Sequence, residues 1–279
     1  NGVVGMKATY GRVSRAGVVP LSFSLDHVGP MTRTVEDNAL MLQVIAGHDP
    51  ADPASARTAV PNYTARLRDG VKGLRIGVIR RFYTRDMEAH PEMIRAIEDA
   101  LGVLKDLGAE IREIDVGPLR DYATANRIIL LSEAYAVHER WLQERPQDYG
   151  ALARERILAG AFYRAADYVQ ALRRRAVLVR RFNDALRDLD VAITASSMEP
   201  ACRIDDAAEF ERTYPRQARA PFNLTGSPTL ALPIGFASDG LPLAMQIIGK
   251  PFDEATVYRA GFAYEQATEW TRHHPPLAA

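Results

Sequence analysis

Few side chains in this 279-residue sequence could do chemistry, and they form no self-contained catalytic motif. Lys7 is the one lysine of the glycine-rich opening, and a lysine base has to be buried and neutral. Cys202 has no neighbouring histidine or cluster of positive charge, so it is a poor candidate nucleophile. The sequence contains no G-x-S-x-G elbow, Walker loop, H-E-x-x-H motif or pair of cysteines at metal-ligand spacing. The residues alone therefore identify no catalytic centre, and they indicate no metal or cofactor.

Two further patterns could be functional. Gly2, Gly5, Gly11 and Gly17 are not placed between a strand and a helix as a dinucleotide-binding loop requires, so we interpret them as turns and close backbone approaches. Glu133 and His138 lie five residues apart, which separates them by about 140° around a helix axis. They cannot both point into one small site, and we interpret them as surface or capping residues.

Charged clusters also have a structural interpretation. Asp49 and Asp52 lie in a Pro/Asp-rich connection, where they are typical turn formers rather than metal ligands. The arginines at positions 173–175, 180 and 181 surround an apolar helical stripe. Such a run is usually a solvated helix face, and the neutral total charge of the chain does not favour nucleic acid.

The composition narrows the class of protein. With 47% hydrophobic residues, the chain can bury a substantial core. The formal net charge is zero, so no long-range field attracts nucleic acid or an anionic membrane. No apolar run reaches the roughly 18 residues of a membrane span, and the opening lacks the pattern of a signal peptide. A single cysteine excludes an intrachain disulfide framework and favours a reducing, cytoplasmic location.

The elements that would position these residues begin with a strand–helix–strand unit. Residues 74–79 are a short, mostly apolar, β-branched run, which predicts a buried strand. Pro91 opens an amphipathic helix that Gly108 stops. Residues 110–115 then alternate as a strand does. A right-handed crossover makes the two strands parallel neighbours, so this unit predicts an α/β fold.

Capping residues and periodicity predict the remaining elements. Thr34 caps a helix that ends at Gly47. The apolar face of this helix is expected to carry Leu40, Met41, Val44 and Ile45. Residues 121–189 are expected to be helical, with breaks near Pro146 and Gly160. Three more strands and a closing helix are expected at residues 190–195, 229–236, 243–248 and 253–270.

Several blocks of the sequence resemble the amidase signature family, and they occur in the family's order. The longest is residues 6–55, beginning MKATYGRVSRAGVVP; the others are DVAITASSMEP (190–200), PFNLTGSP (221–228), TLALPIG (229–235) and LPLAMQIIGKPF (241–252). The resemblance implies an α/β fold with a mixed, mostly parallel β-sheet flanked by helices. It also implies that residues 1–279 are the C-terminal portion of a single amidase-like domain, with a helical segment at about 115–189.

The resemblance further implies hydrolysis of a carboxamide to a carboxylate and ammonia or an amine. In the family, a nucleophilic Ser, a bridging Ser and a catalytic Lys lie upstream of the segment that the opening resembles. We therefore expect the catalytic residues to precede Asn1 and the chain alone to be inactive. Lys7 matches a scaffold position of the family, so no catalytic role is assigned to it. Arg156, Phe222 and Asn223 are the candidate substrate-binding residues.

One branch of the family comprises the A subunits of tRNA-dependent amidotransferases. Arg156 can be matched to the arginine with which that branch holds the glutamine carboxylate, but its ammonium-binding aspartate falls at about Arg216. A cation there would repel the ammonium group, so an amidase acting on a small-molecule amide is favoured. A non-catalytic scaffold or binding protein is the third hypothesis. The expected protein partner is a second copy of the chain or an N-terminal segment, with no nucleic acid or membrane.

Overall fold

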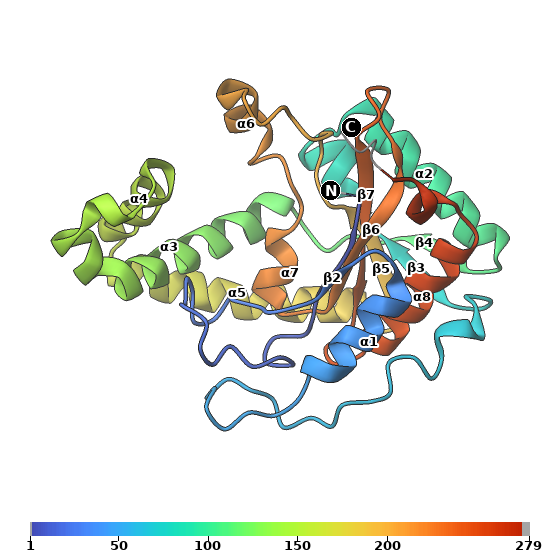
Figure 1. The fold of residues 1–279 in the computed structure, drawn as a ribbon, viewed down its shortest axis with the longest axis horizontal. Coiled ribbons are helices and arrows are strands. Elements are labelled where there is room, and N and C mark those ends of the chain that lie inside the picture. The colour runs from blue at the N-terminus through green and yellow to red at the C-terminus, as the bar shows by residue number, and fades with distance from the viewer. Residues whose placement is uncertain (1, 275–279) are drawn as a thin grey trace.

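A seven-stranded sheet organises the chain, as shown by a computed structural model that describes residues 2–274 (Figure 1). The strand order is β2-β1-β6-β7-β5-β3-β4. The strands are β1 (Val4–Lys7), β2 (Met31–Thr32), β3 (Arg75–Val78), β4 (Glu110–Glu113), β5 (Val191–Ala195), β6 (Thr229–Phe236) and β7 (Pro242–Gly249). The five strands from β3 to β7 are those that the sequence predicts. Strands β1 and β2 lie in the opening, where no strand was expected, and β1 includes Gly5. Gly11 has a φ of 79°, and a Cβ atom there would lie 2.3 Å from the carbonyl oxygen of Ala54, so its interpretation as a turn and close backbone approach is confirmed.

The sheet is mixed, and helices flank it, as expected. Strand β3 pairs in parallel with β4 and β5, which confirms the predicted strand–helix–strand unit. The other four neighbouring pairs are antiparallel, so the expectation of a mostly parallel sheet is wrong. The physical reason is visible at β6 and β7, because a connection of only a few residues allows a hairpin, whereas parallel strands need a long crossover.

The helices form two groups on either side of the sheet. Figure 1 shows α1, α2 and α8 on one side and α3, α5 and α7 on the other. Their bounds are α1 (Val35–Ile45), α2 (Pro91–Asp106), α3 (Leu119–Glu144), α4 (Ala151–Leu158), α5 (Ala165–Ala185), α6 (Ala207–Thr213), α7 (Ala220–Thr225) and α8 (Glu254–Gln266). Shorter helical turns are η1 (Leu67–Asp69), η2 (Phe82–Asp86), η3 (Pro146–Asp148), η4 (Ala159–Phe162) and η5 (Trp270–Arg272). Within residues 2–274, no helix combines the length and apolarity that a membrane crossing requires.

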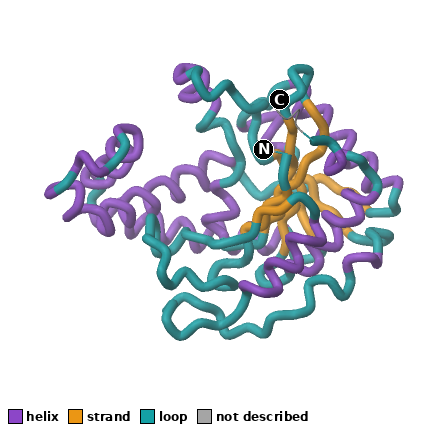
Figure 2. Tube along the Cα trace, in the orientation of Figure 1, coloured by secondary structure: helices purple, strands orange, loops and turns teal. Residues whose placement is uncertain are grey.

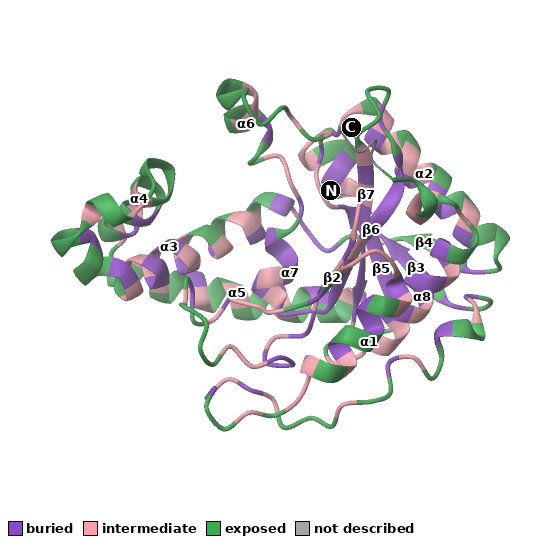
Figure 3. Ribbon diagram, viewed as in Figure 1, coloured by how far each residue is buried: buried purple, intermediate pink, exposed green. Residues whose placement is uncertain are grey.

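The helical middle of the chain projects away from the sheet, as Figure 2 shows for α3, α4 and α5. Its predicted breaks at Pro146 and Gly160 are confirmed, since η3 and η4 lie there. Gly160 also allows a close approach: a Cβ atom at this position would lie 2.1 Å from the carbonyl oxygen of Leu131. Burial is concentrated in the strands, while the outer turns of α4 and α6 are exposed (Figure 3).

Helix α1 begins where the sequence predicts but buries a different face. The Thr34 side chain accepts a hydrogen bond from the Asp37 amide and caps the helix. The expected apolar face is largely exposed, with Val44 83% accessible. The buried face contains Asn38, whose Nδ2 donates to the carbonyl oxygens of Val4 in β1 and of Pro30, the residue before β2. These bonds to strand carbonyls explain why the face with a polar residue turns inward.

A carboxylate from α8 covers the N-terminus of α1. Glu265 is buried and accepts a hydrogen bond of 2.9 Å from the Val35 amide. Burial raises the pKa of Glu265 to about 7, with Asp37 and Glu36 adding repulsion and the Val35 bond opposing the shift. The folded state therefore binds the Glu265 proton more tightly than the unfolded chain, whose ordinary value is 4.5.

This shift predicts a pH-dependent effect of the substitution Glu265→Gln. The stabilisation that the parent gains from the protonated carboxyl is complete below pH 4.5 and is lost as pH rises through about 7. Gln keeps the acceptor oxygen and removes the ionisation. The free energy of unfolding of the variant should therefore rise relative to that of the parent by up to about 3 kcal/mol over this pH range. Urea unfolding of both proteins at pH 5 and pH 8 measures the difference. An equal difference at the two pH values would contradict the assigned pKa.

Candidate active site

The floor of the candidate site is one face of the sheet at strands β1, β6 and β7. In the antiparallel register, Gly5 and Lys7 of β1 lie opposite Ala231 and Thr229 of β6, and Ala231 lies opposite Gln246 of β7. Directly opposed residues share a face of an antiparallel sheet. Because Gly5 and Ala231 are small, a cavity of about 270 Å³ remains above them.

The roof of this cavity comes from α7 and from the segment that follows β5. Ser196, Arg219, Phe222 and Asn223 complete its lining. Phe222 is fully buried against Phe182, with 5.9 Å between the ring centroids, which fixes how α7 sits. The Asn223 Nδ2 donates to the carbonyl oxygen of Leu25 over 3.1 Å. Two of the three residues predicted to bind substrate, Phe222 and Asn223, therefore lie in one cavity.

Gln246 of β7 connects the sheet to the segments that cover the cavity. Its buried Nε2 donates to the carbonyl oxygens of Ala195 (2.8 Å) and Ala218 (3.2 Å). These carbonyls directly precede Ser196 and Arg219 in the chain, so one side chain holds both lining segments against β7. Sequence reasoning missed Gln246, Ser196 and Arg219 as site residues.

Lys7 supplies the amine of the cavity. Its Nζ donates to the carbonyl oxygens of Ser227 (2.5 Å) and Ala8 (3.4 Å). Burial lowers the pKa of Lys7 to about 7, and the negative charge of Glu254 partly opposes this shift. The amine therefore changes its charge near neutral pH. Within residues 2–274, no hydrogen bond joins it to the Ser196 hydroxyl, so these residues assemble no serine–lysine pair.

A buried ion pair lies behind Lys7. Glu254 accepts a hydrogen bond of 2.9 Å from the amide of Thr9, two residues beyond β1. Arg12 approaches the same carboxylate to 3.9 Å, and both side chains are at most 1% exposed. Arg12 also donates to the carbonyl oxygens of Thr58 and Ala59. The pair joins the chain leaving β1 to α8 and to a distant loop.

His27 is held neutral near the cavity. Burial lowers the pKa of His27 to about 3; the charge of Lys7 adds to the shift, and a hydrogen bond to the Leu25 carbonyl opposes it. The bond joins Nδ1 to that oxygen over 2.7 Å. An imidazole with this pKa is uncharged at neutral pH, so it cannot serve as an imidazolium acid.

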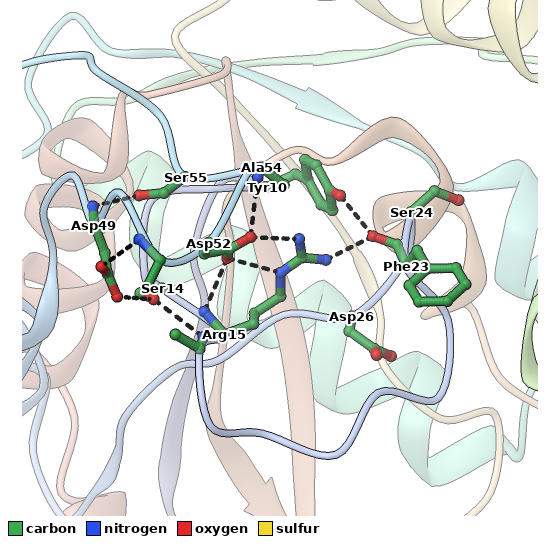
Figure 4. A network of polar contacts seen from close by, with 12 residues as sticks. Tyr10, Ser14, Arg15, Phe23, Ser24, Asp26, Asp49, Asp52, Ala54 and Ser55 are labelled. Atoms are coloured by element: carbon green, nitrogen blue, oxygen red, sulfur yellow. Dashed lines mark hydrogen bonds and ion pairs between the residues drawn. The ribbon is translucent and has the colours of Figure 1, made fainter. Parts of the chain in front are cut away.

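Side chains from several elements hold residues 20–25, the segment that carries Leu25. Figure 4 shows the carbonyl of Phe23 accepting from Tyr10 and Arg15, each over 2.6 Å. Arg15 also pairs with Asp52 at 3.1 Å. Asp52 and Asp49 accept amide hydrogen bonds from residues two positions further on, which confirms their interpretation as turn formers. The hydrogen bond from Arg15 lowers the pKa of Asp52 to about 2.

The same segment is bound from α3, which corrects the interpretation of Glu133 and His138 as surface or capping residues. Both side chains are buried. Glu133 accepts from the hydroxyls of Ser22 (2.5 Å) and Ser24 (2.8 Å), and the His138 Nε2 lies 3.1 Å from the carbonyl oxygen of Pro20. They contact different residues of the segment, so the prediction that they share no small site agrees with their contacts. A helix angle alone could not show that another segment covers this side of α3.

Arg175 corrects the interpretation of the arginine run. The arginines at positions 173, 174, 180 and 181 are exposed, as expected. Arg175 is half-buried and donates to the carbonyl oxygens of Leu224 (2.8 Å) and Ser24 (3.1 Å). Burial lowers its pKa, against the opposing effect of Glu133. It thereby joins α5 to the roof helix and to residues 20–25.

Arg156, the third predicted substrate-binding residue, lies outside the cavity lining. Its guanidinium stacks on the Tyr214 ring at 4.6 Å. Arg216, two residues further on, pairs with Glu199 at 2.6 Å. The two positions matched to the amidotransferase branch are therefore near each other in the fold, and the Arg216 cation is already paired. No group of three or more His, Cys, Asp or Glu side chains in residues 2–274 is placed to hold a metal ion.

Comparison with known proteins places this α/β chain in a family. A family model described as Amidase matches residues 1–258. The chain therefore belongs to the amidase signature family, as its sequence blocks predicted.

The similarity covers nearly all of this chain but only part of its relatives. An amidase of Pseudomonas putida is 44% identical over 98% of this chain and 60% of its own length. The A subunit of the glutamyl-tRNA(Gln) amidotransferase of Trichlorobacter lovleyi is 38% identical over 96% of this chain and 60% of its own length. A crystal structure of an amidase superposes with a TM-score of 0.79 at 30% identity, over 96% of this chain and 58% of that one. The chain thus spans about three fifths of the length of these curated relatives.

Proposed function

We propose that this chain forms the acyl-side wall of a site that hydrolyses a small-molecule carboxamide. The supporting observation is the cavity in which the Lys7 amine, the Asn223 amide and the buried Phe222 meet on the face of β1, β6 and β7. Phe222 offers an apolar wall, and Asn223 is held in place by its bond to Leu25. Lys7 holds the Ser227 carbonyl and is a positioning residue of this wall.

The nucleophile is proposed to come from outside these 279 residues. The family's reaction uses a Ser-Ser-Lys set, in which serine attacks the carbonyl and backbone N–H groups hold the oxyanion. We propose that residues 1–279 are the C-terminal portion of one amidase-like domain in the cytoplasm, and that they need neither metal nor cofactor. They should release no ammonia from acetamide, benzamide or glutamine on their own. Turnover of any of these by the isolated polypeptide would overturn this part of the proposal.

A second candidate function is that of an amidotransferase A subunit, which the 38% identity to such a protein favours. Glutamine would require a free carboxylate for its ammonium group. Glu199 lies near the matched position, but Arg216 (2.6 Å) and Arg212 (3.5 Å) already pair with it. Equilibrium dialysis with radiolabelled glutamine tests this second function. Saturable glutamine binding that Glu199→Gln abolishes would support the amidotransferase function.

The proposed protein partner is a second copy of the chain or the remaining part of a family-length protein. The outward face of α1 supports this, because Leu40, Met41 and Val44 are all at least 47% exposed. Edge strand β2 adds Met31, 75% exposed. Exposed apolar groups of this kind mark association surfaces. Sedimentation equilibrium should give a mass above the 30.9 kDa of one chain; a strict monomer at high concentration would contradict the dimer.

A further inference from the structure

A second cavity lies among the helices that project from the sheet, away from the lining of the candidate active site. This α3–α5 groove has a volume of about 430 Å³ and is bounded by α3, η4 and the start of α5. Its aromatic walls are Phe23, Tyr135, Tyr163 and Tyr168. A volume of this size is within the range of small-molecule sites.

Small residues open the groove. Gly160 lets η4 approach α3 so closely that a Cβ there would also lie 2.7 Å from the Cβ of Tyr135. Ala136, Ala161 and Ala165 line the space beside it. The aromatic rings therefore stand around a shallow floor instead of filling it, and a flat ring is the shape that such walls accommodate best.

The charged groups of the groove are already paired. Glu133 accepts from three hydroxyls, of Ser22, Ser24 and Tyr168, and from the Ser24 amide. Arg164 binds Asp167 through two side-chain hydrogen bonds of 3.1 and 2.9 Å. The Glu133 oxygens leave no acceptor free for a cation, and their negative charge repels an anion. Arg164 keeps further N–H donors, but its side chain is 80% exposed and stays hydrated. The groove favours a neutral molecule.

Among the described residues of the lining, one buried side-chain polar atom has no hydrogen-bond partner. The Oγ of Ser132 is buried and forms no hydrogen bond with any described residue. A hydroxyl in this state is costly, since it has lost water and gained nothing. A ligand with one hydrogen-bonding substituent would satisfy it.

We propose that the α3–α5 groove binds a neutral aromatic ring bearing one polar substituent, such as a carboxamide or a phenol. The ring lies among Phe23, Tyr135, Tyr163 and Tyr168, and its substituent bonds to the Ser132 Oγ. The inference does not depend on amide hydrolysis. Ser24 and Leu25 run between the groove and the Lys7 cavity, with Ser24 bound to Glu133 and Leu25 to Asn223.

Titration of the 279-residue chain with benzamide, followed by ligand-observed NMR, tests this proposal. A ligand of this size should bind with a Kd of about 0.1–5 mM. Benzoate should bind at least roughly 5-fold more weakly because the Glu133 carboxylate of the lining repels its negative charge. The matched pair Ala165→Trp and Ala166→Trp separates the groove from other sites, since both residues are exposed in the first turn of α5 and only Ala165 lines the groove. Ala165→Trp should abolish binding, and Ala166→Trp should leave it unchanged.

The variant Ser132→Ala provides a second, independent test of the proposal. It should weaken benzamide binding by roughly 5–10-fold while leaving the melting temperature equal or higher, because it removes an unpartnered buried hydroxyl. A purely structural serine would instead lower the melting temperature. Lys7→Met should not alter benzamide binding at the groove. Binding that survives Ala165→Trp, or that Lys7→Met abolishes, would overturn the proposal and locate benzamide elsewhere.

Discussion

Replacing Glu254 by Ala is expected to lower the free energy of unfolding by about 3–5 kcal/mol, the cost of leaving a buried charge without its partner. Arg12 would lose the carboxylate at 3.9 Å, and the Thr9 amide would lose its acceptor. Three polar atoms of the pair, Arg12 Nε and Nη2 and Glu254 Oε2, have no hydrogen-bond partner among the described residues, so the ion pair is their main stabilising contact. Chemical denaturation at pH 7 measures the change.

A control variant and a double-mutant cycle decide whether the buried pair causes this loss. Glu269→Ala removes a carboxylate that is 71% exposed and paired with Arg272, so it should cost less than about 1 kcal/mol. A double-mutant cycle compares Arg12→Met, Glu254→Met and the double variant. The double variant removes both charges and should be less destabilised than the sum of these two single changes. Additive losses would show that the two side chains do not interact.

Replacing Lys7 by Met is expected to make the protein more stable than the parent below pH 7. The folded state releases the Lys7 proton near pH 7, whereas the unfolded chain keeps it to the ordinary value of 10.5. Unfolding therefore takes up a proton between these values, and parent stability rises with pH across the window. Met cannot ionise and lacks this dependence. The difference in free energy of unfolding between Lys7→Met and the parent should therefore shrink by about 2–4 kcal/mol from pH 6 to pH 10.

The matched control for Lys7→Met is Lys105→Met, at an exposed position of α2. Thermal unfolding of both variants and the parent at pH 6, 8 and 10 provides the comparison. Lys105→Met should have the same melting temperature as the parent at every pH. If the Lys7→Met advantage is the same at pH 6 and pH 10, the amine does not titrate near neutrality.

Local patterns in the sequence predicted much of the fold because local chemistry determines those elements. Thr34 caps α1, Pro91 opens α2, and the helix between β3 and β4 is long enough to be the crossover that parallel neighbours need. Non-local contacts decided the rest. Strand β1 is only four residues long and exists through its pairing with β2 and β6. The buried face of α1 follows from bonds of Asn38 to distant carbonyls, which no helical periodicity encodes.

The candidate site was predictable only in part for the same reason. Phe222 and Asn223 belong to a block that resembles the family, and both line the cavity. Lys7 and Gln246 join them through strand register, which brings residues more than 200 positions apart onto one face. The alternation of Gly5 and Lys7 with the buried Val4 and Met6 is the one local signal that could have indicated a strand with a functional face.

A chimera tests the central claim most directly. Residues 1–279 would replace the matching 60% of the Pseudomonas putida amidase, and ammonia release would be measured on an amide that the parent enzyme hydrolyses. The account predicts turnover by the chimera, a loss of roughly 100-fold for Lys7→Met, and no loss for Lys105→Met. A folded chimera without turnover, or one in which the two lysine variants behave alike, would contradict the assignment of the Lys7 cavity as the wall of an amide-hydrolysing site.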